Sequence, residues 1–168
     1  GMALRRISQY QFAWNDVVSA ALVSEYEAEH RLYFLERPDR KKRAIVTAVL
    51  AGSPPDEAAM GYQLTGWHFA VVAWGEHPEA AIQAIGATQG SGHLKVSGTD
   101  GAVYAWFRSV RKRKDEGPDL SAVKLPTGTR LAIGQYAEGV EGFRRSHRQA
   151  GLAYRVARLG SDDITAYR

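Results

Sequence analysis

The sequence predicts an α+β domain in which helices pack on a mainly antiparallel sheet, preceded by an N-terminal helical segment. The first indication is a nearly continuous run of apolar, β-branched and aromatic residues from Trp67 to Trp74, which is typical of a buried central strand. The second is a pair of strand-like runs, 93–97 and 102–107, on either side of Asp100-Gly101. An Asp-Gly pair between two such runs is a strong β-hairpin signal. The third is the helical periodicity of the segments before and after these strands.

From Trp67 onward, the predicted elements follow the order β-α-β-β-α-β-α-β. A hairpin embedded between βα units indicates a ferredoxin-like split βαβ core with an added edge strand. After the first strand and around the hairpin, the predicted elements are a helix over 78–88, a short helix over 119–124, a strand over 130–136, a long helix from Gly139 toward Gly160 and a last strand over 163–167.

The first part of the chain is predicted to be helical. Residues 7–35 contain no Gly or Pro, and apolar side chains recur there every three or four residues, which makes one stripe along a long helix. Two shorter helices are predicted, one over 39–50 and one from Ser53, a candidate N-cap, to about Leu64. The chain is therefore expected to divide into a helical segment, 2–64, and an α/β domain, 65–168.

The long apolar stripe leaves two interpretations open, because a helix of this length has more apolar surface than a small domain can cover. The stripe either packs within its own chain or pairs with the same helix of a second subunit, which would make the protein a homodimer. Charged residues lie mostly off the stripe, at Asp16, Glu25, Glu27, Glu29 and Arg31. The candidate dimerisation residues on the stripe are Tyr10, Trp14, Val17, Val18 and Ala21.

The composition is that of a soluble globular chain, since 45% of its 168 residues are apolar and 24% are charged. The absence of cysteine excludes disulfides, thiolate metal sites and cysteine nucleophiles, and it agrees with a cytoplasmic location. No apolar run reaches the roughly 20 residues of a membrane span, so no membrane contact is expected. The net charge of +4 permits contact with nucleic acid without requiring it.

The segment from Gly139 to Gly160 carries the most specific pattern in the chain. It begins Gly-Val-Glu-Gly-Phe-Arg-Arg-Ser-His-Arg-Gln-Ala and lies between two predicted strands. This β–helix–β block resembles the GGDEF-like central domain of the PucR/CdaR family of bacterial transcription regulators, whose usual wording is Gly-x-x-Gly-Phe-Arg-x-Ser-(His/Tyr)-x-x-Ala. The Gly-Tyr-x-Leu passage that precedes the first strand in that family is matched by residues 61–64. The residues that fit the longer motif are Gly139, Gly142, Phe143, Arg144, Ser146, His147 and Ala150.

The resemblance implies a GGDEF/adenylyl-cyclase-type fold, which agrees with the element order derived from patterning. It also implies a regulatory module of a bacterial, cytoplasmic DNA-binding protein. In the family, a helix-turn-helix domain follows this module after a linker. We therefore expect DNA to be read only through a helix-turn-helix domain outside this chain, which ends at Arg168.

The residues that enzymatic GGDEF domains use to make cyclic di-GMP are missing. Such phosphoryl transfer needs carboxylates that hold magnesium, on the first strand and in the hairpin turn. Here the first strand has no acidic residue, Glu76 follows only after Gly75, and the turn has a single carboxylate, Asp100, which is better explained as a turn former. The five histidines are scattered, and there is no phosphate loop. We expect no catalytic residue, no metal site and no cofactor, so the chain is predicted not to be an enzyme.

Two other functions remain open. One is a small-molecule-sensing domain that uses the remnant of the cyclase-type cleft, with an apolar or backbone-bound effector. The other is a ferredoxin-like RNA-binding module in which Tyr104 and Trp106, on one face of a strand, stack bases. The last helix should bury one stripe, and its basic residues then form either a solvated face or a contact with a partner or a nucleic-acid backbone. These basic residues are Arg144, Arg145, Arg148, Arg155 and Arg158.

Overall fold

The computed structural model describes residues 38–89, 92–111, 117–160 and 162–167. The contacts within the chain separate residues 1–41 from residues 42–168, and the second unit is described here by itself. The predicted helix over 7–35, with its candidate dimerisation residues, lies outside the described residues.

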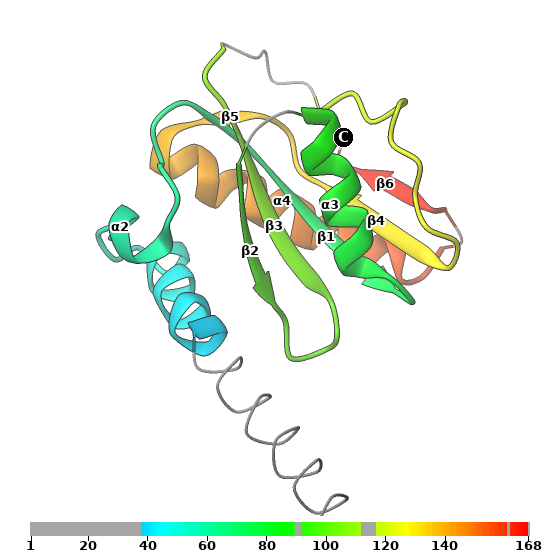
Figure 1. The fold of residues 1–168 in the computed structure, drawn as a ribbon, viewed down its shortest axis with the longest axis horizontal. Coiled ribbons are helices and arrows are strands. Elements are labelled where there is room, and N and C mark those ends of the chain that lie inside the picture. The colour runs from blue at the N-terminus through cyan, green and yellow to red at the C-terminus, as the bar shows by residue number, and fades with distance from the viewer. Residues whose placement is uncertain (1–37, 90–91, 112–116, 161, 168) are drawn as a thin grey trace, which may run out of the picture. The chain divides into compact units, whose positions relative to one another are not determined.

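In the part of the chain that the structure describes, six strands form one sheet, and most neighbouring strands run antiparallel (Figure 1). The central strand β1 (Trp67–Gly75) is buried from His68 to Ala73, which confirms the predicted buried central strand. The sheet order is β2-β3-β1-β4-β6, and β5 also pairs with β1. The other strands are β2 (His93–Ser97), β3 (Val103–Ser109), β4 (Thr129–Ile133), β5 (Ala137–Glu138) and β6 (Ile164–Ala166).

Helices cover both faces of the sheet (Figure 1). The helix α3 (Pro78–Gln89) packs on one face, where its buried residues meet side chains from alternate positions of β1 and β3. The helix α4 (Gly139–Ala157) packs on the other face. The hairpin of β2 and β3 places β3 between β1 and β2, so the predicted α+β fold of the ferredoxin-like type is confirmed.

The described residues before β1 add to the core on the α4 side. Residues 38–50 are helical, as predicted for 39–50. Val46, Val49 and Leu64 are buried in the same apolar cluster as Phe143 of α4. The predicted division of the chain after Leu64 stays a prediction.

The helix expected from Ser53 to about Leu64 is wrong in its bounds, since α2 spans only Glu57–Met60. Asp56, and not Ser53, is the N-cap, and its carboxylate accepts a hydrogen bond from the Ala59 N–H at 3.0 Å. Gly61 ends the helix in the left-handed conformation, with φ at +61°. The two consecutive prolines after Ser53 keep the chain extended before the helix begins.

The short helix predicted over 119–124 is also wrong. Residues 121 and 122 form a turn in an otherwise irregular segment. The Asp119 carboxylate accepts the Ser121 N–H at 2.9 Å, and a local bond of this kind competes with helix formation. Leu120, only 7% exposed, points into the apolar cluster on the α3 side and fixes the segment there.

The strand predicted over 130–136 ends at Ile133 because the chain bulges before it rejoins β1. Val71 pairs with Ile133 and His68 pairs with Ala137, so three residues on this side face two on β1. The Gly134 N–H still donates to the Ala70 carbonyl, at 2.9 Å. The Ala70 N–H donates instead to Ser146 Oγ on α4, at 2.8 Å, because the bulge has removed its partner within the sheet.

The helix α4 approaches this bulge at backbone distance. A Cβ on Gly134 would lie 2.3 Å from the Ser146 carbonyl oxygen, and a Cβ on Gly142 would lie 2.3 Å from the Ala137 carbonyl carbon. Neither obstacle is a flexible side-chain end that could move aside. Glycine is therefore required at both positions by the depth at which the helix sits.

Gly134→Ala is expected to lower the free energy of unfolding by about 2–3 kcal/mol, because the added methyl group meets backbone atoms of α4. Gly151→Ala in the same helix is the control: a Cβ there has no neighbour within 4 Å, and alanine favours a helix over glycine by about 0.5–1 kcal/mol. Urea denaturation of both variants measures the difference. Equal midpoints for the two would contradict the close approach.

Candidate functional site

The motif from Gly139 to Ala150 forms the first three turns of α4 and the turn that leads into it. Gly139 has φ at +69° and donates its N–H to the Gly66 carbonyl at 2.8 Å, so the helix starts beside the beginning of β1. Gly142 and Ser146 make the contacts with the bulge described above. The positive φ explains Gly139, and the close approach of the helix to Ala137 explains Gly142.

The aromatic residues of the motif cover the middle of β3. The Phe143 ring stacks on Trp106 with 4.7 Å between ring centroids, and the His147 ring stacks on the same indole at 5.3 Å. His147 also contacts Tyr104, at 5.8 Å. Trp106 is only 1% exposed, so it offers no surface on which an RNA base could stack. Ala150 completes the motif as a fully buried small residue under the helix.

Arg144 joins α4 to the chain that precedes α2. Its Nε donates to the Val49 carbonyl at 2.7 Å and one terminal nitrogen donates to the Ser53 carbonyl at 3.1 Å. The other terminal nitrogen pairs with the Glu141 carboxylate. The Val49 carbonyl belongs to the last turn of the helix over 38–50 and the Ser53 carbonyl lies just beyond its end, where a cation is favourable. The guanidinium is thus engaged on all sides by the protein itself.

The hairpin turn between β2 and β3 holds its one carboxylate in place. One oxygen of Asp100 accepts the Ala102 N–H at 3.2 Å, and the other accepts the Tyr154 hydroxyl at 3.0 Å. The first bond closes the turn, as a turn-forming aspartate does. The second ties the turn to α4.

The end of β1 lies at this same edge of the sheet, and aromatic and guanidinium groups fill it. The Trp74 ring meets the Tyr154 ring edge-on at 4.8 Å, and the Arg130 guanidinium lies 5.4 Å from the centre of the Trp74 ring. Arg130 also donates to the carbonyls of Ala157 and Gly160 at the end of α4. The sequence alone did not predict this cluster, because its members come from three separate elements, β1, β4 and α4.

Carboxylates do not gather at this edge. Glu76, the first acidic residue after β1, is exposed, and its side chain lies against Gly128. Among the residues that the structure describes, no group of three or more His, Asp or Glu side chains is placed to hold a metal ion. A cyclase would need carboxylate oxygens free to bind a metal at this edge of the sheet. In the described residues, the edge instead holds a hydrogen-bonded Asp100 and the packed side chains of Trp74, Tyr154 and Arg130.

His68, the histidine of the central strand, belongs to a buried hydrogen-bond chain. Its Nε2 donates to the Leu64 carbonyl at 3.0 Å, so its Nδ1 accepts from the Tyr62 hydroxyl at 2.8 Å. Burial lowers the pKa of His68 and raises the pKa of Tyr62, which keeps both groups neutral. The Gly-Tyr-x-Leu passage thus has a structural role, because it anchors the chain before β1.

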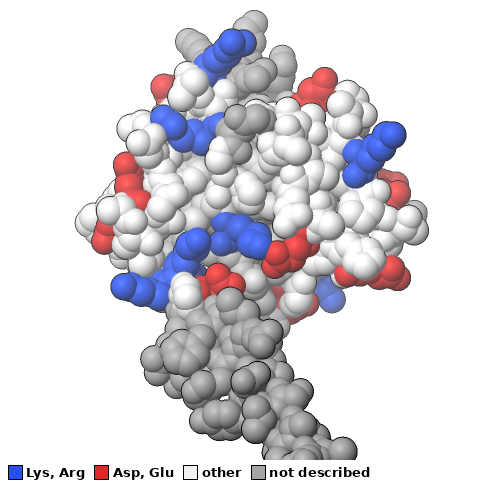
Figure 2. Space-filling model, in the orientation of Figure 1, with Lys and Arg blue, Asp and Glu red and all other residues white. Residues whose placement is uncertain are grey.

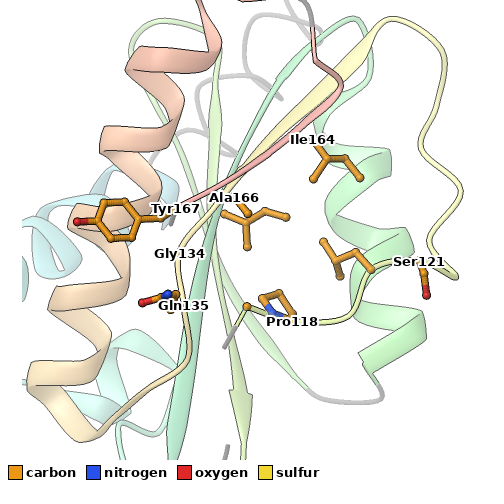
Figure 3. Close-up of a pocket in the computed structure, with 10 residues that line it drawn as sticks. Pro118, Ser121, Gly134, Gln135, Ile164, Ala166 and Tyr167 are labelled. Carbon is orange, nitrogen blue, oxygen red and sulfur yellow. The ribbon is translucent and has the colours of Figure 1, made fainter. Parts of the chain in front are cut away.

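Two hollows open elsewhere on the surface. One, of about 250 Å³, lies between the loop at Pro118, the end of β4 at Gly134 and the strand β6, and its lining is mainly apolar (Figure 3). The other, of about 410 Å³, is lined by Tyr62, His93 and Arg108 among others. Neither includes residues of the hairpin turn, so neither is the remnant cyclase-type cleft expected to bind an effector.

Charged side chains form no continuous basic surface on the face shown in Figure 2. Lysines and arginines there stand in separate groups, the largest of which lies in the lower part of the view with acidic residues beside it, and white residues separate the groups. A contact with nucleic acid along this face has no electrostatic support.

The stability of the folded chain should rise with pH between about 4 and 6.5. Burial against the aromatic cluster, helped by the charge of Arg148, lowers the pKa of His147 to about 4, whereas an unfolded histidine titrates near 6.5. As the pH falls, the unfolded chain therefore binds the proton before the folded chain does. The free energy of unfolding that is present above pH 6.5 falls by roughly 1–3 kcal/mol as the pH approaches 4. His147→Phe keeps a ring on Trp106 and should reduce this dependence in urea denaturation, leaving the part that comes from the lowered pKa of the buried His68. The exposed His77→Asn is the control, and an equal flattening there would contradict the assignment.

Among the residues that the structure describes, no helix is both long and apolar enough to cross a membrane. No curated protein and no solved structure matches the chain. Residues 56–156 match the family of GGDEF-like domains, a range that runs from the N-cap of α2 to the last turn of α4. The match spans more than half of the sequence and contains the central strand, the hairpin and the motif on α4. The chain therefore belongs to the GGDEF-like domain family.

Proposed function

We propose that this chain is the non-catalytic regulatory and dimerisation module of a PucR/CdaR-type transcription regulator that acts in the bacterial cytoplasm. The observation that carries the proposal is the motif from Gly139 to Ala150, which matches that family's wording and serves to seat α4 on the sheet. DNA would be read by a helix-turn-helix domain outside this chain, and the module would position or pair that domain.

The proposal that the module is not an enzyme rests on the edge of the sheet where β1 ends. Magnesium in phosphoryl-transfer sites is bound by one or two carboxylates together with water and phosphate oxygens. Asp100 is the only carboxylate in the hairpin turn. One of its oxygens accepts a hydrogen bond within the turn and the other accepts one from the Tyr154 hydroxyl. Binding a metal there would require breaking both bonds.

The proposed homodimer rests on the sequence of residues 7–35. The apolar stripe through Tyr10, Trp14, Val17, Val18 and Ala21 is continuous over three turns of a predicted helix. A stripe of this kind buries itself against a second apolar surface, since exposed contiguous apolar area is unfavourable in water.

Sensing of a small molecule is a second candidate, favoured by the apolar hollow beside β6. Its volume of about 250 Å³ and its lining by Pro118, Leu120, Ile133 and Ile164 suit a small apolar effector (Figure 3). An effector bound there would touch the strand that follows α4, and so could bias the position of whatever the chain is joined to.

Incubation with GTP and either Mg²⁺ or Mn²⁺ is expected to yield no cyclic di-GMP, because no free carboxylate pair is available at the hairpin edge. Chromatographic analysis of the products measures this, with an active diguanylate cyclase as the positive control. Metal-dependent product that disappears in Asp100→Asn would show that the chain is an enzyme.

The regulator proposal is tested by comparing this chain with the product of its complete gene. In a gel-shift experiment on DNA from upstream of that gene, the complete product should retard the DNA and this chain should not. Retardation by this chain alone, lost on neutralising α4 arginines such as Arg148→Gln, would instead make the module itself the nucleic-acid binder.

A further inference from the structure

The outer face of α4 carries a row of exposed apolar side chains. Leu152 is 43% exposed, Val156 is 65% exposed and Leu159, in the turn that follows the helix, is 92% exposed. The spacing of four and three residues places them on one face, opposite the stripe that packs on the sheet. Single exposed apolar residues are ordinary on a protein surface, but an aligned row of three is typical of a contact surface.

Arginines accompany this row. From Gly139 to Gly160 the chain contains five arginines and one carboxylate, Glu141, which pairs with Arg144. Arg148 precedes Leu152 by one helical turn and Arg155 flanks the row, and both are exposed. Neither forms a salt bridge with a carboxylate among the described residues. A partner for this face needs apolar side chains and carboxylates together.

Residues 7–35 supply that chemistry within this sequence. They contain four carboxylates and one arginine, beside the apolar stripe. Most of these charged residues lie off the stripe, but in a helix Glu25 would follow Ala21 by one turn and fall on the stripe itself. The distance along the chain from Trp14 to Glu25 is eleven residues, as is the distance from Arg148 to Leu159. Eleven residues of helix span about 16 Å, and Leu159 lies in the turn just after the end of α4 at Ala157.

We propose that the outer face of α4 receives the predicted helix of residues 7–35 from a second copy of this chain, in antiparallel orientation. The inference rests on the homodimer in the proposed function. It identifies the surface that the apolar stripe of residues 7–35 contacts in the second subunit. The antiparallel register brings apolar residues onto apolar residues and a carboxylate onto a guanidinium. The facing pairs are Trp14 with Leu159, Val17 with Val156, Ala21 with Leu152 and Glu25 with Arg148.

Charge favours this pairing over pairing of the two N-terminal segments with each other. Each segment 7–35 has a net charge of −3, four carboxylates against one arginine. Two such helices side by side repel each other, whereas the arginines of α4 attract the segment. The interaction should therefore weaken as ionic strength rises.

Cross-linking tests the pairing directly, because the chain has no native cysteine and each introduced one is unique. Ala21→Cys and Leu152→Cys chains with different tags, mixed and mildly oxidised, should give a product that carries both tags. Lack of this mixed product overturns the inference. If Ala21→Cys cross-links with itself instead, the N-terminal helices pair with each other. If a disulfide forms only in a chain that carries both cysteines, and the product keeps the mass of a monomer, the segment packs on its own chain.

Sedimentation of charge variants tests the interface independently. Leu152→Glu and Val156→Glu change exposed side chains, so folding is retained, and each should raise the dimer dissociation constant about tenfold or more. Val110→Glu, at a residue 76% exposed after β3, is the matched control and should leave it unchanged. Arg148→Glu should also weaken the dimer, and mixing it with Glu25→Arg chains should restore association.

These measurements separate failure of the inference from failure of the proposed function. A wild-type chain that sediments as a monomer at high micromolar concentration removes the homodimer itself. A dimer that splits with Trp14→Glu but is indifferent to Leu152→Glu keeps the homodimer and overturns the role of α4.

Discussion

The approach of α4 to the bulge between β4 and β5 is the constraint on which the rest of the fold depends. Gly134 and Gly142 let two backbone segments meet where a Cβ would lie 2.3 Å from a backbone atom. Ser146 then accepts the one N–H of β1 that the bulge leaves without a partner in the sheet. A helix fixed at this depth brings Phe143 onto Trp106 and carries Tyr154 to the hairpin turn. The residues of the motif thus fix the position of α4 on the sheet.

The parts of the fold that were predictable are those set by local pattern. The run from Trp67 to Trp74, the Asp-Gly hairpin and the periodicity of α4 each depend on residues a few positions apart. The bulge was not predictable, because Ser146, which satisfies the Ala70 N–H that the bulge leaves without a sheet partner, is 76 residues away in sequence. The turn at Asp119 was missed for a smaller reason: one side-chain hydrogen bond outweighs the weak helical propensity of six residues. The resemblance named the motif residues, and only the geometry gave each a physical role.

The edge of the sheet where β1 ends shows how a cyclase-type position can become structural. Asp100 is satisfied by a backbone N–H and a hydroxyl, and Arg130 donates to carbonyls at the end of α4 while it lies against Trp74. Groups that could bind a charged ligand are therefore bound to each other and to α4. The residues of this network lie in the hairpin, β1, β4 and α4, so no single stretch of the sequence predicts it. Its consequence is rigidity between the hairpin and the helix, since each contact joins elements that are distant in the chain.

A helix held rigidly on its inner face presents a fixed pattern on its outer face. The inner positions of α4 have no freedom to change, because they meet backbone at Gly142 and an indole at Phe143. Leu152, Val156 and Leu159 are exposed, and none of the core clusters of the described residues includes them. Polar residues at these positions would leave the contacts of α4 with the sheet unchanged. Apolar side chains in such a row are therefore accounted for by something that covers them. A surface whose shape is already fixed loses little entropy on binding, so a modest apolar row flanked by arginines is sufficient for a specific contact.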